Sequence, residues 1–249
     1  MIKIHKAKKY KSNKEIVKFY NEFGFVSIKN YISRTTLLSI KNDLNREFKK
    51  KFNKDFISGV PYLDKYNKKK LFVTHRIISN LQTLKSLNLK LSNFNKLLFP
   101  NKSIFYISDG LMLGLPKDKR LTYDFHQENN YMKNFDDILN IHYPIFFKSD
   151  YKNGSMSVLS KSHKEGSLKY VKKKKSNNSY TDLIPVGIEK IKEKYEEVLL
   201  ELELGDVVFF NKDLIHKSNY NYTNKPRPVG IGRFTSSHGN FGSLNPEDL

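Results

Sequence analysis

The sequence predicts an α+β domain in which helices come first and short strands then close as a barrel or a sandwich. Residues 12–52 and 81–99 place apolar side chains at helical spacing. After residue 103 the texture changes to short apolar or alternating runs separated by turn residues, as in two-layer β architectures. No linker or internal repeat divides the chain, so residues 1–249 are predicted to form a single domain.

Capping residues define the first two helices. Ser12 and Glu15 form a capping box at the start of one helix, and Gly24 ends it. Ser33 caps a second helix over residues 33–52, in which one apolar stripe recurs at the spacing of a packed face. These two helices are therefore expected to pack against the sheet that follows.

Shorter segments complete the first half of the chain. Residues 25–31 (FVSIKNY) alternate apolar and polar side chains and predict a strand between the two helices. Residues 81–99 are helix-like before Pro100, whereas residues 50–80 carry no strong signal. The basic residues 1–10 are expected to be flexible.

The second half reads as a series of strands. Strands are expected within SIFYISDGLMLGL (103–115), DDILNIHYPIFFK (136–148), NGSMSVLSKSHKEG (153–166), YEEVLLELELGDVVFFNKDLIHKS (195–218) and RPVGIGRFTSS (227–237). Residues 168–182, which include the lysine run, are expected to form an exposed loop.

Composition excludes several classes of protein. No run of about 18 apolar residues occurs, so no membrane span is expected, and the basic N-terminus has no apolar segment typical of a secretory signal. A cytoplasmic protein fits these observations. Without cysteine, any metal must be bound by histidine and carboxylate side chains.

The formal net charge of +20 raises the question of nucleic acid binding. Only six of the 45 basic residues are arginine, and the lysines are scattered, which is typical of a biased composition rather than of a phosphate-reading groove. Nucleic acid is therefore not the expected partner. The positive charge remains compatible with an anionic small-molecule substrate.

The stretch DFHQENNYM (124–132) contains a candidate metal site. His126 and Glu128 are two residues apart, and consecutive even positions of a strand point to one side. His216, at the end of a strongly apolar strand, is the candidate third ligand. Two histidines and one carboxylate form a facial triad that binds Fe(II) and leaves three coordination positions open. A His-x-Glu pair alone is also common in ordinary strands.

Other polar residues have alternative interpretations. His142 lies on an apolar strand and is expected to line the pocket or to pack in the core, and His163 is expected to cap or pack in a turn. Arg120 either binds an anionic substrate or forms a surface ion pair. The polar residues after the metal strand either face substrate or form a polar loop; they are Gln127, Asn129, Asn130 and Tyr131.

Four segments in order resemble one enzyme family. They are EFGFVSI near the start, FHQE with the first two proposed ligands, NGSMSVLSKSHKEG in the middle, and HKSNYNYTNKPR, which begins with the third proposed ligand. Together they resemble the phytanoyl-CoA dioxygenase family of Fe(II)- and 2-oxoglutarate-dependent oxygenases, over nearly the whole chain. Two positions depart from the family pattern: Glu128 replaces the commoner aspartate, and Lys161 replaces a turn glycine.

The resemblance implies a double-stranded β-helix and a set of functional residues. Iron would be bound by His126, Glu128 and His216. 2-Oxoglutarate would be bound through its distal carboxylate by Arg227, assisted by Ser218, and Tyr143 would form a wall of the co-substrate pocket. The implied activity is hydroxylation of a small metabolite, such as an amino acid, a sugar-linked precursor or a natural-product intermediate, with O2 as oxidant.

Two other functions remain open. Arg227 and Arg233 are six residues apart, a spacing also used by nucleic-acid demethylases among the 2-oxoglutarate oxygenases, so a nucleic-acid-directed oxygenase is one alternative. Steep salt dependence of DNA or RNA binding would identify it. A metal-free barrel that binds a ligand is the other alternative, and failure to bind iron would support it.

Overall fold

A computed structural model describes residues 2–66, 81–132, 135–174 and 181–236. Its helices are α1 (Asn13–Phe23), α2 (Arg34–Phe52), α3 (Phe56–Tyr66), α5 (Gln82–Leu91), α6 (Asn95–Leu98) and α7 (Ile188–Lys194), with 3-10 turns η1 (Ser92–Phe94), η2 (Glu128–Asn130) and η3 (Ser162–Glu165). Its strands are β1 (Lys3–Lys6), β2 (Phe25–Ile28), β3 (Phe105–Gly114), β4 (Leu139–Pro144), β5 (Met156–Leu159), β6 (Tyr170–Lys174), β7 (Thr181–Pro185), β8 (Glu197–Glu201), β9 (Val207–Asn211), β10 (His216–Ser218) and β11 (Arg227–Thr235).

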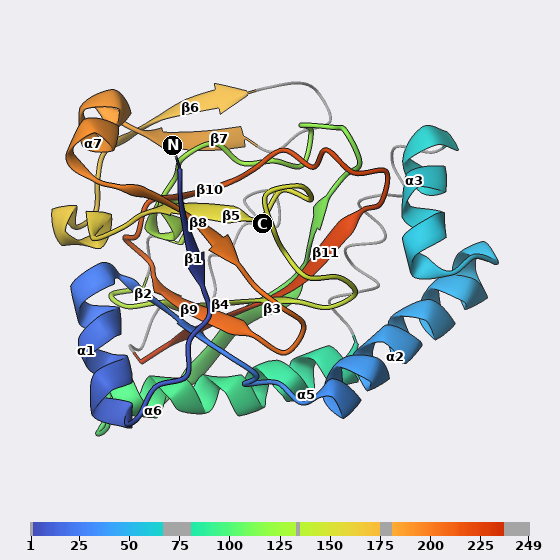
Figure 1. The fold of residues 1–249 in the computed structure, drawn as a ribbon, viewed down its shortest axis with the longest axis horizontal. Helices are drawn as coiled ribbons and strands as arrows, with labels where there is room; N and C mark the ends of the chain where they lie inside the picture. Colours follow the sequence, from blue (N-terminus) through green and yellow to red (C-terminus); the bar gives the residue numbers. More distant parts are fainter. Residues whose placement is uncertain (1, 67–80, 133–134, 175–180, 237–249) are drawn as a thin grey trace.

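The strands form two sheets and a separate hairpin. The smaller sheet has the order β1-β8-β5-β10, the larger sheet has the order β2-β9-β4-β11-β3, and β6 pairs with β7. Helices α5 and α6 run beneath the larger sheet, and the β6–β7 hairpin lies at the opposite side of the molecule (Figure 1). This arrangement confirms the predicted α+β fold in which two sheets pack together.

Two apolar cores hold the layers together. One joins the larger sheet to the helices and includes the predicted stripe of α2, which is Leu37, Ile40, Leu44 and Phe48. The other lies between the two sheets and is built from strands of both, with Phe25, Met156, Val158, Val198, Val208 and Phe210 among its members. Burying apolar surface on both sides of the larger sheet fixes which residues of each strand face which layer.

The caps expected from the sequence are present. The Ser12 hydroxyl accepts a hydrogen bond from the Glu15 backbone N–H at 3.2 Å, and Ser33 accepts one from Thr36 at 3.1 Å. Gly24 ends α1 with a φ of 81°, a left-handed conformation that favours glycine. Local sequence signals were therefore sufficient to place both helices.

Two segments, residues 1–10 and residues 168–182, differ from what the sequence predicts. Lys3–Lys6, expected to be flexible, forms β1 and pairs in parallel with β8, with Lys3 opposite Val198. The main-chain hydrogen bonds of an otherwise free sheet edge explain this order. The stretch expected to be an exposed loop at 168–182 is exposed along Tyr170–Lys174, but these residues form β6 because they pair with β7.

The long strand β11 shows how the two faces of the larger sheet differ. Its even positions face the helices: a Cβ added to Gly230 would lie 2.3 Å from the Tyr143 ring, and one added to Gly232 would lie 2.9 Å from Asn88. Its odd positions, which include Arg227 and Arg233, therefore face the smaller sheet. No helix within the described residues is long and apolar enough to cross a membrane.

Candidate metal centre

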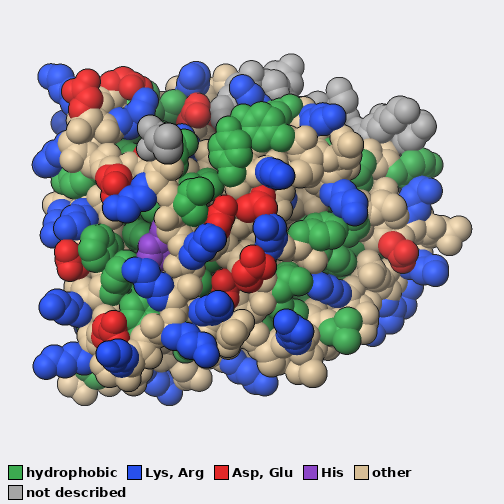
Figure 2. All heavy atoms as spheres, in the orientation of Figure 1, with side chains coloured by type: hydrophobic (Ala, Val, Ile, Leu, Met, Phe, Trp, Pro, Cys, Tyr) green, Lys and Arg blue, Asp and Glu red, His purple; other side chains and the backbone are tan. Residues whose placement is uncertain are grey.

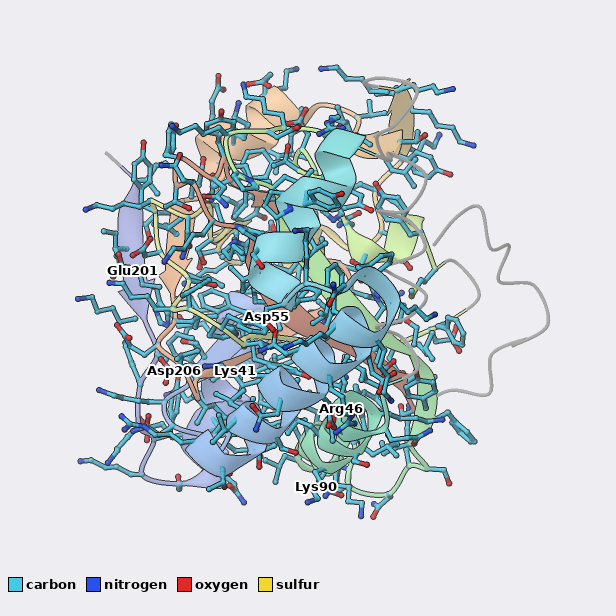
Figure 3. The ribbon with its side chains drawn as sticks, turned by 90° about the vertical axis from the view of Figure 1, so that its right-hand side faces the viewer. Lys41, Arg46, Asp55, Lys90, Glu201 and Asp206 are labelled. Atoms are coloured by element: carbon cyan, nitrogen blue, oxygen red, sulfur yellow. The ribbon has the colours of Figure 1, made fainter. Side chains whose placement is uncertain are left out.

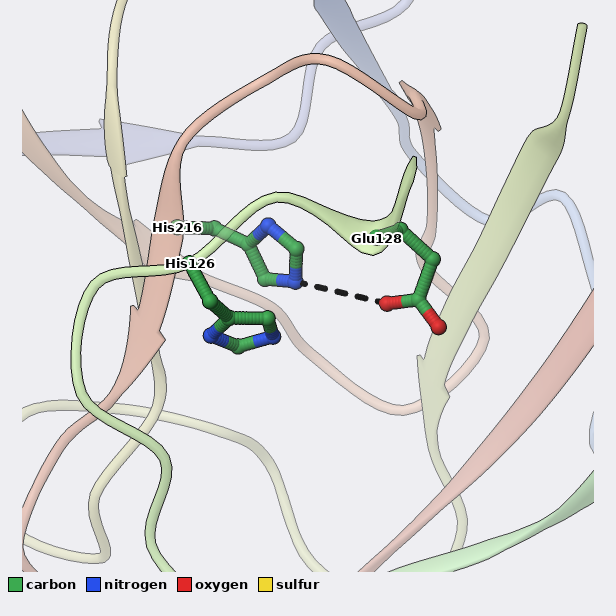
Figure 4. Close-up of side chains that lie close together, drawn as sticks. All are labelled: His126, Glu128 and His216. Carbon is green, nitrogen blue, oxygen red and sulfur yellow. Dashed lines mark ion pairs between the residues drawn. The ribbon is translucent and has the colours of Figure 1, made fainter. Parts of the chain in front are cut away.

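His126 and His216 lie side by side although they are far apart in the chain. Their backbones form an antiparallel bridge in which His126 N–H donates to His216 O at 2.9 Å and His216 N–H donates to His126 O at 3.0 Å. The ring centroids are 4.2 Å apart, and both side chains point toward Glu128 (Figure 4). The structure thus brings together the three residues singled out from the sequence.

Both imidazole rings are oriented by a backbone carbonyl two residues earlier. The Nδ1 atom of His126 is 2.7 Å from Asp124 O, and Nδ1 of His216 is 2.9 Å from Leu214 O. With Nδ1 as the donor, Nε2 keeps its lone pair, which is the tautomer that binds a metal. Burial, followed by the positive charge of His126, lowers the pKa of His216 to about 3, so its ring is neutral.

Glu128 completes the cluster from a different element than expected. The sequence suggested the end of a strand, but Glu128 begins the 3-10 turn η2. Its Oε2 is 3.8 Å from His216 Nε2, and one ligand atom from each of the three residues lies within 4.8 Å of the others. All three side chains are buried, and among the described residues this is the group with the composition and spacing of a metal site.

Arg233 contacts the third member of this cluster directly. Its Nε donates to Glu128 Oε1 at 2.6 Å, and Nη1 lies 3.4 Å from Ser108 Oγ. Burial alone would raise the pKa of Glu128, but the positive charge of Arg233, the largest opposing influence, holds this pKa below its ordinary value. Glu128 is therefore a carboxylate, the form in which it binds a metal.

Arg227 is a buried cation with spare hydrogen-bonding capacity. Its Nε donates to Asn153 O at 3.0 Å, whereas Nη1 is buried and has no partner. Gly114 faces the guanidinium, and a Cβ there would lie 3.3 Å from Arg227 Nε. Burial lowers the pKa of Arg227 to about 10, so it stays charged at neutral pH. Within the described part of the chain, no carboxylate forms an ion pair with it.

His142 and Tyr143 are neighbours on β4 but face opposite sides of the sheet. Burial, then the positive charge of Arg227, lowers the pKa of His142 to about 3, and its Nε2 is buried without a partner. Tyr143 instead packs among the helix-facing residues and donates its hydroxyl to Asn88 Oδ1 at 3.2 Å. His142 therefore lies on the same side of the larger sheet as Arg227, whereas Tyr143 faces the helices.

Ser218 and Asn221, two polar residues that follow His216 in the sequence, have different roles. Ser218 lies two residues after His216 on β10, so both side chains leave the strand on the same side. The Asn221 amide donates to Gly114 O at 3.0 Å and to Lys225 O at 2.8 Å, which holds the turn before Arg227. Asn221 is thus a structural residue of the turn that delivers Arg227.

Gln127 fixes the segment that carries His126 and Glu128. Its buried amide donates to Gly166 O at 2.8 Å and Asp213 O at 2.7 Å, and accepts from Leu168 N–H at 3.0 Å. It therefore points away from the cluster and ties two loops to the metal-site segment. Its position between two candidate ligands was the available signal, but nothing in the sequence identified its partners.

Two tyrosines flank His126 on the hairpin side. The ring centroid of Tyr123 is 5.1 Å from that of His126, and the centroid of Tyr131 is 5.6 Å away and perpendicular to it. The Tyr131 hydroxyl donates to Thr181 O at 3.0 Å and accepts from Leu183 N–H at 3.1 Å. Tyr131 therefore links β7 to the surroundings of His126.

Lys161 adopts the conformation that a glycine would normally supply. Its φ is 73°, in the left-handed region, where a residue other than glycine is strained by about 1 kcal/mol. Its backbone N–H donates to Phe23 O at 3.0 Å, and its Nζ lies 3.1 Å from Glu22. These contacts with α1 retain the turn despite the loss of glycine.

Arg120 is held at the surface by its neighbour Asp118. Its Nε and its backbone N–H each donate to the Asp118 carboxylate at 2.8 Å. The expectation that Arg120 forms an ion pair is confirmed. Its charge is compensated, so it is a weaker candidate for binding an anion than Arg227.

The comparisons with known proteins agree with this geometry. The family model described as phytanoyl-CoA dioxygenase matches residues 20–229. None of the curated proteins matches the chain.

Several solved structures share the fold. The structure of EctD from S. alaskensis with 2-oxoglutarate and 5-hydroxyectoine is 13% identical, covers 94% of this chain and 80% of its own, and has a TM-score of 0.63. EvdO2 from Micromonospora carbonacea var. aurantiaca with 2-oxoglutarate is 13% identical, with 97% of each chain covered and a TM-score of 0.61. The epimerase SnoN with Fe3+, alpha ketoglutarate and nogalamycin RO is 11% identical over 92% and 87%, with a TM-score of 0.64. The double-stranded β-helix fold expected from the sequence is thereby confirmed.

Proposed function

This chain belongs to the phytanoyl-CoA dioxygenase family, and we propose that it hydroxylates a small metabolite at iron held by His126, Glu128 and His216. Membership makes it a non-haem, iron- and 2-oxoglutarate-dependent oxygenase. Iron held there would activate O2, of which one oxygen atom enters the substrate as a hydroxyl group and the other enters succinate as 2-oxoglutarate loses CO2.

The residues present fit iron. Two imidazoles with their Nδ1 atoms tied to carbonyls, and a carboxylate kept ionised by Arg233, provide nitrogen and oxygen ligands from one side. This donor set suits Fe(II) and leaves positions for other ligands. The chain's contribution is to orient these three groups and to keep them away from water, since all three are buried.

The observation that carries the proposal is the buried guanidinium of Arg227, which has no carboxylate partner among the described residues and whose Nη1 has no hydrogen-bond partner. A buried cation without a carboxylate partner is unfavourable unless an anion neutralises it. We propose that the distal carboxylate of 2-oxoglutarate is this anion and that Ser218 assists. His142, whose buried Nε2 also has no partner, lies on the same side of the sheet as Arg227 and is a further candidate to contact the co-substrate.

The ligands of solved structures with the same fold support a small-molecule substrate. Solved structures with this fold contain 5-hydroxyectoine or nogalamycin RO, both small molecules. Tyr123 and Tyr131 beside His126 offer aromatic surface on which a small substrate could pack. The net charge of +20 is compatible with an anionic substrate. A chain without cysteine fits a reducing compartment, and we propose action in the cytoplasm.

Nucleic acid remains the less favoured substrate. Lysine and arginine side chains cover the face seen in Figure 2 and acidic side chains are interspersed among them, so this face has no single basic groove. A nucleic-acid-directed enzyme would show DNA or RNA binding that weakens steeply with salt. Binding that is weak and insensitive to salt would exclude it.

Anaerobic titration with Fe(II) and then 2-oxoglutarate tests the proposal. We expect the weak visible metal-to-ligand charge-transfer band of a bound 2-oxo acid in wild type. Arg227→Met should require at least about 30-fold more 2-oxoglutarate, since losing the partner of a buried charge costs about 2–5 kcal/mol. Arg46→Met, on the exposed face of α2, is the matched control (Figure 3). A folded wild-type protein without the band would favour a metal-free ligand-binding barrel.

A further inference from the structure

The two carboxylate oxygens of Glu128 have different neighbours, because Arg233 donates a hydrogen bond to only one of them. Oε1 accepts the 2.6 Å bond from Arg233 Nε, while Oε2 lies 3.8 Å from His216 Nε2. Among the described residues, Arg233 is the lysine or arginine that forms an ion pair with a member of the three-residue cluster. A short bond between two ionised groups is among the stronger hydrogen bonds in proteins.

The backbone of Arg233 is held on both sides. Strand β11 lies between β4 and β3 in the larger sheet, with Asn140 and Ser108 opposite Arg233 on the two neighbours. The Ser108 hydroxyl also lies 3.4 Å from Nη1. A side chain on an interior strand is better fixed than one on a loop, so Arg233 can act as a stop against which Glu128 rests.

The contact between Arg233 and Glu128 matters because the glutamate side chain is long. Glutamate is one methylene longer than aspartate, and a free glutamate carboxylate can bind a metal through both oxygens. A second oxygen on iron would take one of the three positions that the co-substrate and O2 need. In this chain Oε1 is already engaged by Arg233, which leaves Oε2 to face the histidines.

We propose that Arg233 is a positioning residue that keeps Glu128 a one-oxygen ligand and thereby preserves the open positions for 2-oxoglutarate and O2. This inference rests on the proposed iron site and adds a role that the three ligands and Arg227 do not supply. It also explains how glutamate serves at a position where the family more often has aspartate.

Cobalt(II) in place of iron provides a readout that does not depend on turnover. The intensity of its visible absorption reports the coordination number, and 2-oxoglutarate can be titrated into the cobalt-loaded protein. For Arg233→Met we expect an altered cobalt spectrum and a dissociation constant for 2-oxoglutarate raised about 10- to 100-fold, the size of effect seen when a residue orienting a ligand is lost. Arg233→Lys keeps the charge and should lie between Met and wild type.

Two comparisons isolate the interaction. Arg46→Met removes an exposed arginine that pairs with Asp43 on α2, and it should match wild type in both readouts. In a Glu128→Asp background the carboxylate no longer reaches Arg233, so adding Arg233→Met should change the 2-oxoglutarate affinity no further. Far-ultraviolet circular dichroism of each variant confirms folding, and Arg233→Lys remains the informative variant if Arg233→Met unfolds.

The possible outcomes distinguish a failure of the Arg233 role from a failure of the proposed iron site. If wild type binds neither cobalt nor iron, the proposed iron site fails and the inference fails with it. If wild type binds both metal and 2-oxoglutarate and Arg233→Met behaves identically, only the role of Arg233 is overturned. A rise in KM for the substrate with unchanged cobalt spectrum and co-substrate affinity would assign Arg233 to the substrate pocket instead, and would equally overturn the inference.

Discussion

The two faces of the larger sheet are formed by the same strands but differ in how tightly they are packed and in the polar groups they carry. On the face toward the helices, Tyr143 and Asn88 pack so closely that β11 needs glycine at 230 and 232. On the face toward the smaller sheet, buried polar atoms lack partners, such as Arg227 Nη1 and His142 Nε2. Buried polar groups are normally satisfied, so Arg227 and His142 are available to a ligand, whereas on the helix-facing side Asp109 Oδ2 is an unpartnered atom beside a close-packed core.

Truncating Tyr143 should produce the largest effect on stability. Its side chain is fully buried among the helix-facing residues, and replacing a large buried aromatic residue by alanine costs about 3–5 kcal/mol. Urea unfolding of Tyr143→Ala measures this loss. His142→Ala, one residue away on the other face, is the control and should lose much less. Equal losses for the two variants would contradict the division between the faces.

Adding a single methyl group to Gly230 tests the same packing from the opposite strand. A Cβ there would lie 2.3 Å from the Tyr143 ring, and overpacking a core costs about 1–3 kcal/mol. Thermal unfolding of Gly230→Ala should show this loss. In a Tyr143→Ala background the same substitution should be tolerated, because the obstructing ring is gone. Additive losses would show that some other neighbour limits the space.

Arg227→Met should leave the stability of the ligand-free protein within about 1 kcal/mol of wild type. Removing a buried, unpaired charge is favourable, and this gain offsets the lost hydrogen bond to Asn153, which is itself worth about 1 kcal/mol. Urea unfolding without metal or 2-oxoglutarate measures the difference. A loss as large as that of Tyr143→Ala would mean that Arg227 is structural rather than reserved for a ligand.

Asp109, on the helix-facing side, should give the smallest effect, visible as a pH dependence. Burial is the largest influence and raises the pKa of Asp109, partly offset by hydrogen bonds with Tyr106 and Asn88 and by the charge of Lys85. The folded state therefore holds the proton more tightly than the unfolded state, and the titratable groups near Asp109 are Tyr106, Tyr143 and Lys85.

The sign of the Asp109 effect follows from this difference in proton binding. Its stabilising contribution is complete below the unfolded pKa of about 3.9 and is lost as pH rises through the folded pKa. Asp109→Asn should remove that decline, so the free energies of unfolding of wild type and variant should converge toward low pH and separate above it. Parallel curves across this range would rule out the titration of Asp109 as the cause.

Local signals predicted a large part of the molecule. The caps at Ser12 and Ser33 and the stop at Gly24 depend on short stretches of chain, and the structure has all three. His126 and Glu128 could be recognised by spacing and His216 by its surroundings, and they do lie together. These features were predictable because residue type and spacing alone determine them.

Features that depend on strand register could not be read from the sequence. Tyr143 and His142 differ by one position and face opposite sides of β4, and the sequence suggested a pocket role for both because it did not show which face each side chain takes. The contact of Arg233 with Glu128 joins residues 105 positions apart, and only the spacing of Arg233 from Arg227 was apparent. That the chain forms a single domain stays a prediction.

The pairing of β1 with β8 has a consequence for the order of events during synthesis. Lys3 and Val198 are partners, so β1 leaves the ribosome long before β8 and must wait for the intervening residues before it can pair. Until then residues 2–6 form an unpaired segment in which Ile2 and Ile4 alternate with basic residues, and its free edge could associate with other nascent chains. The lysines at positions 3 and 6 counter this hazard by charge repulsion, which gives part of the molecule's positive charge a purpose unrelated to its substrate.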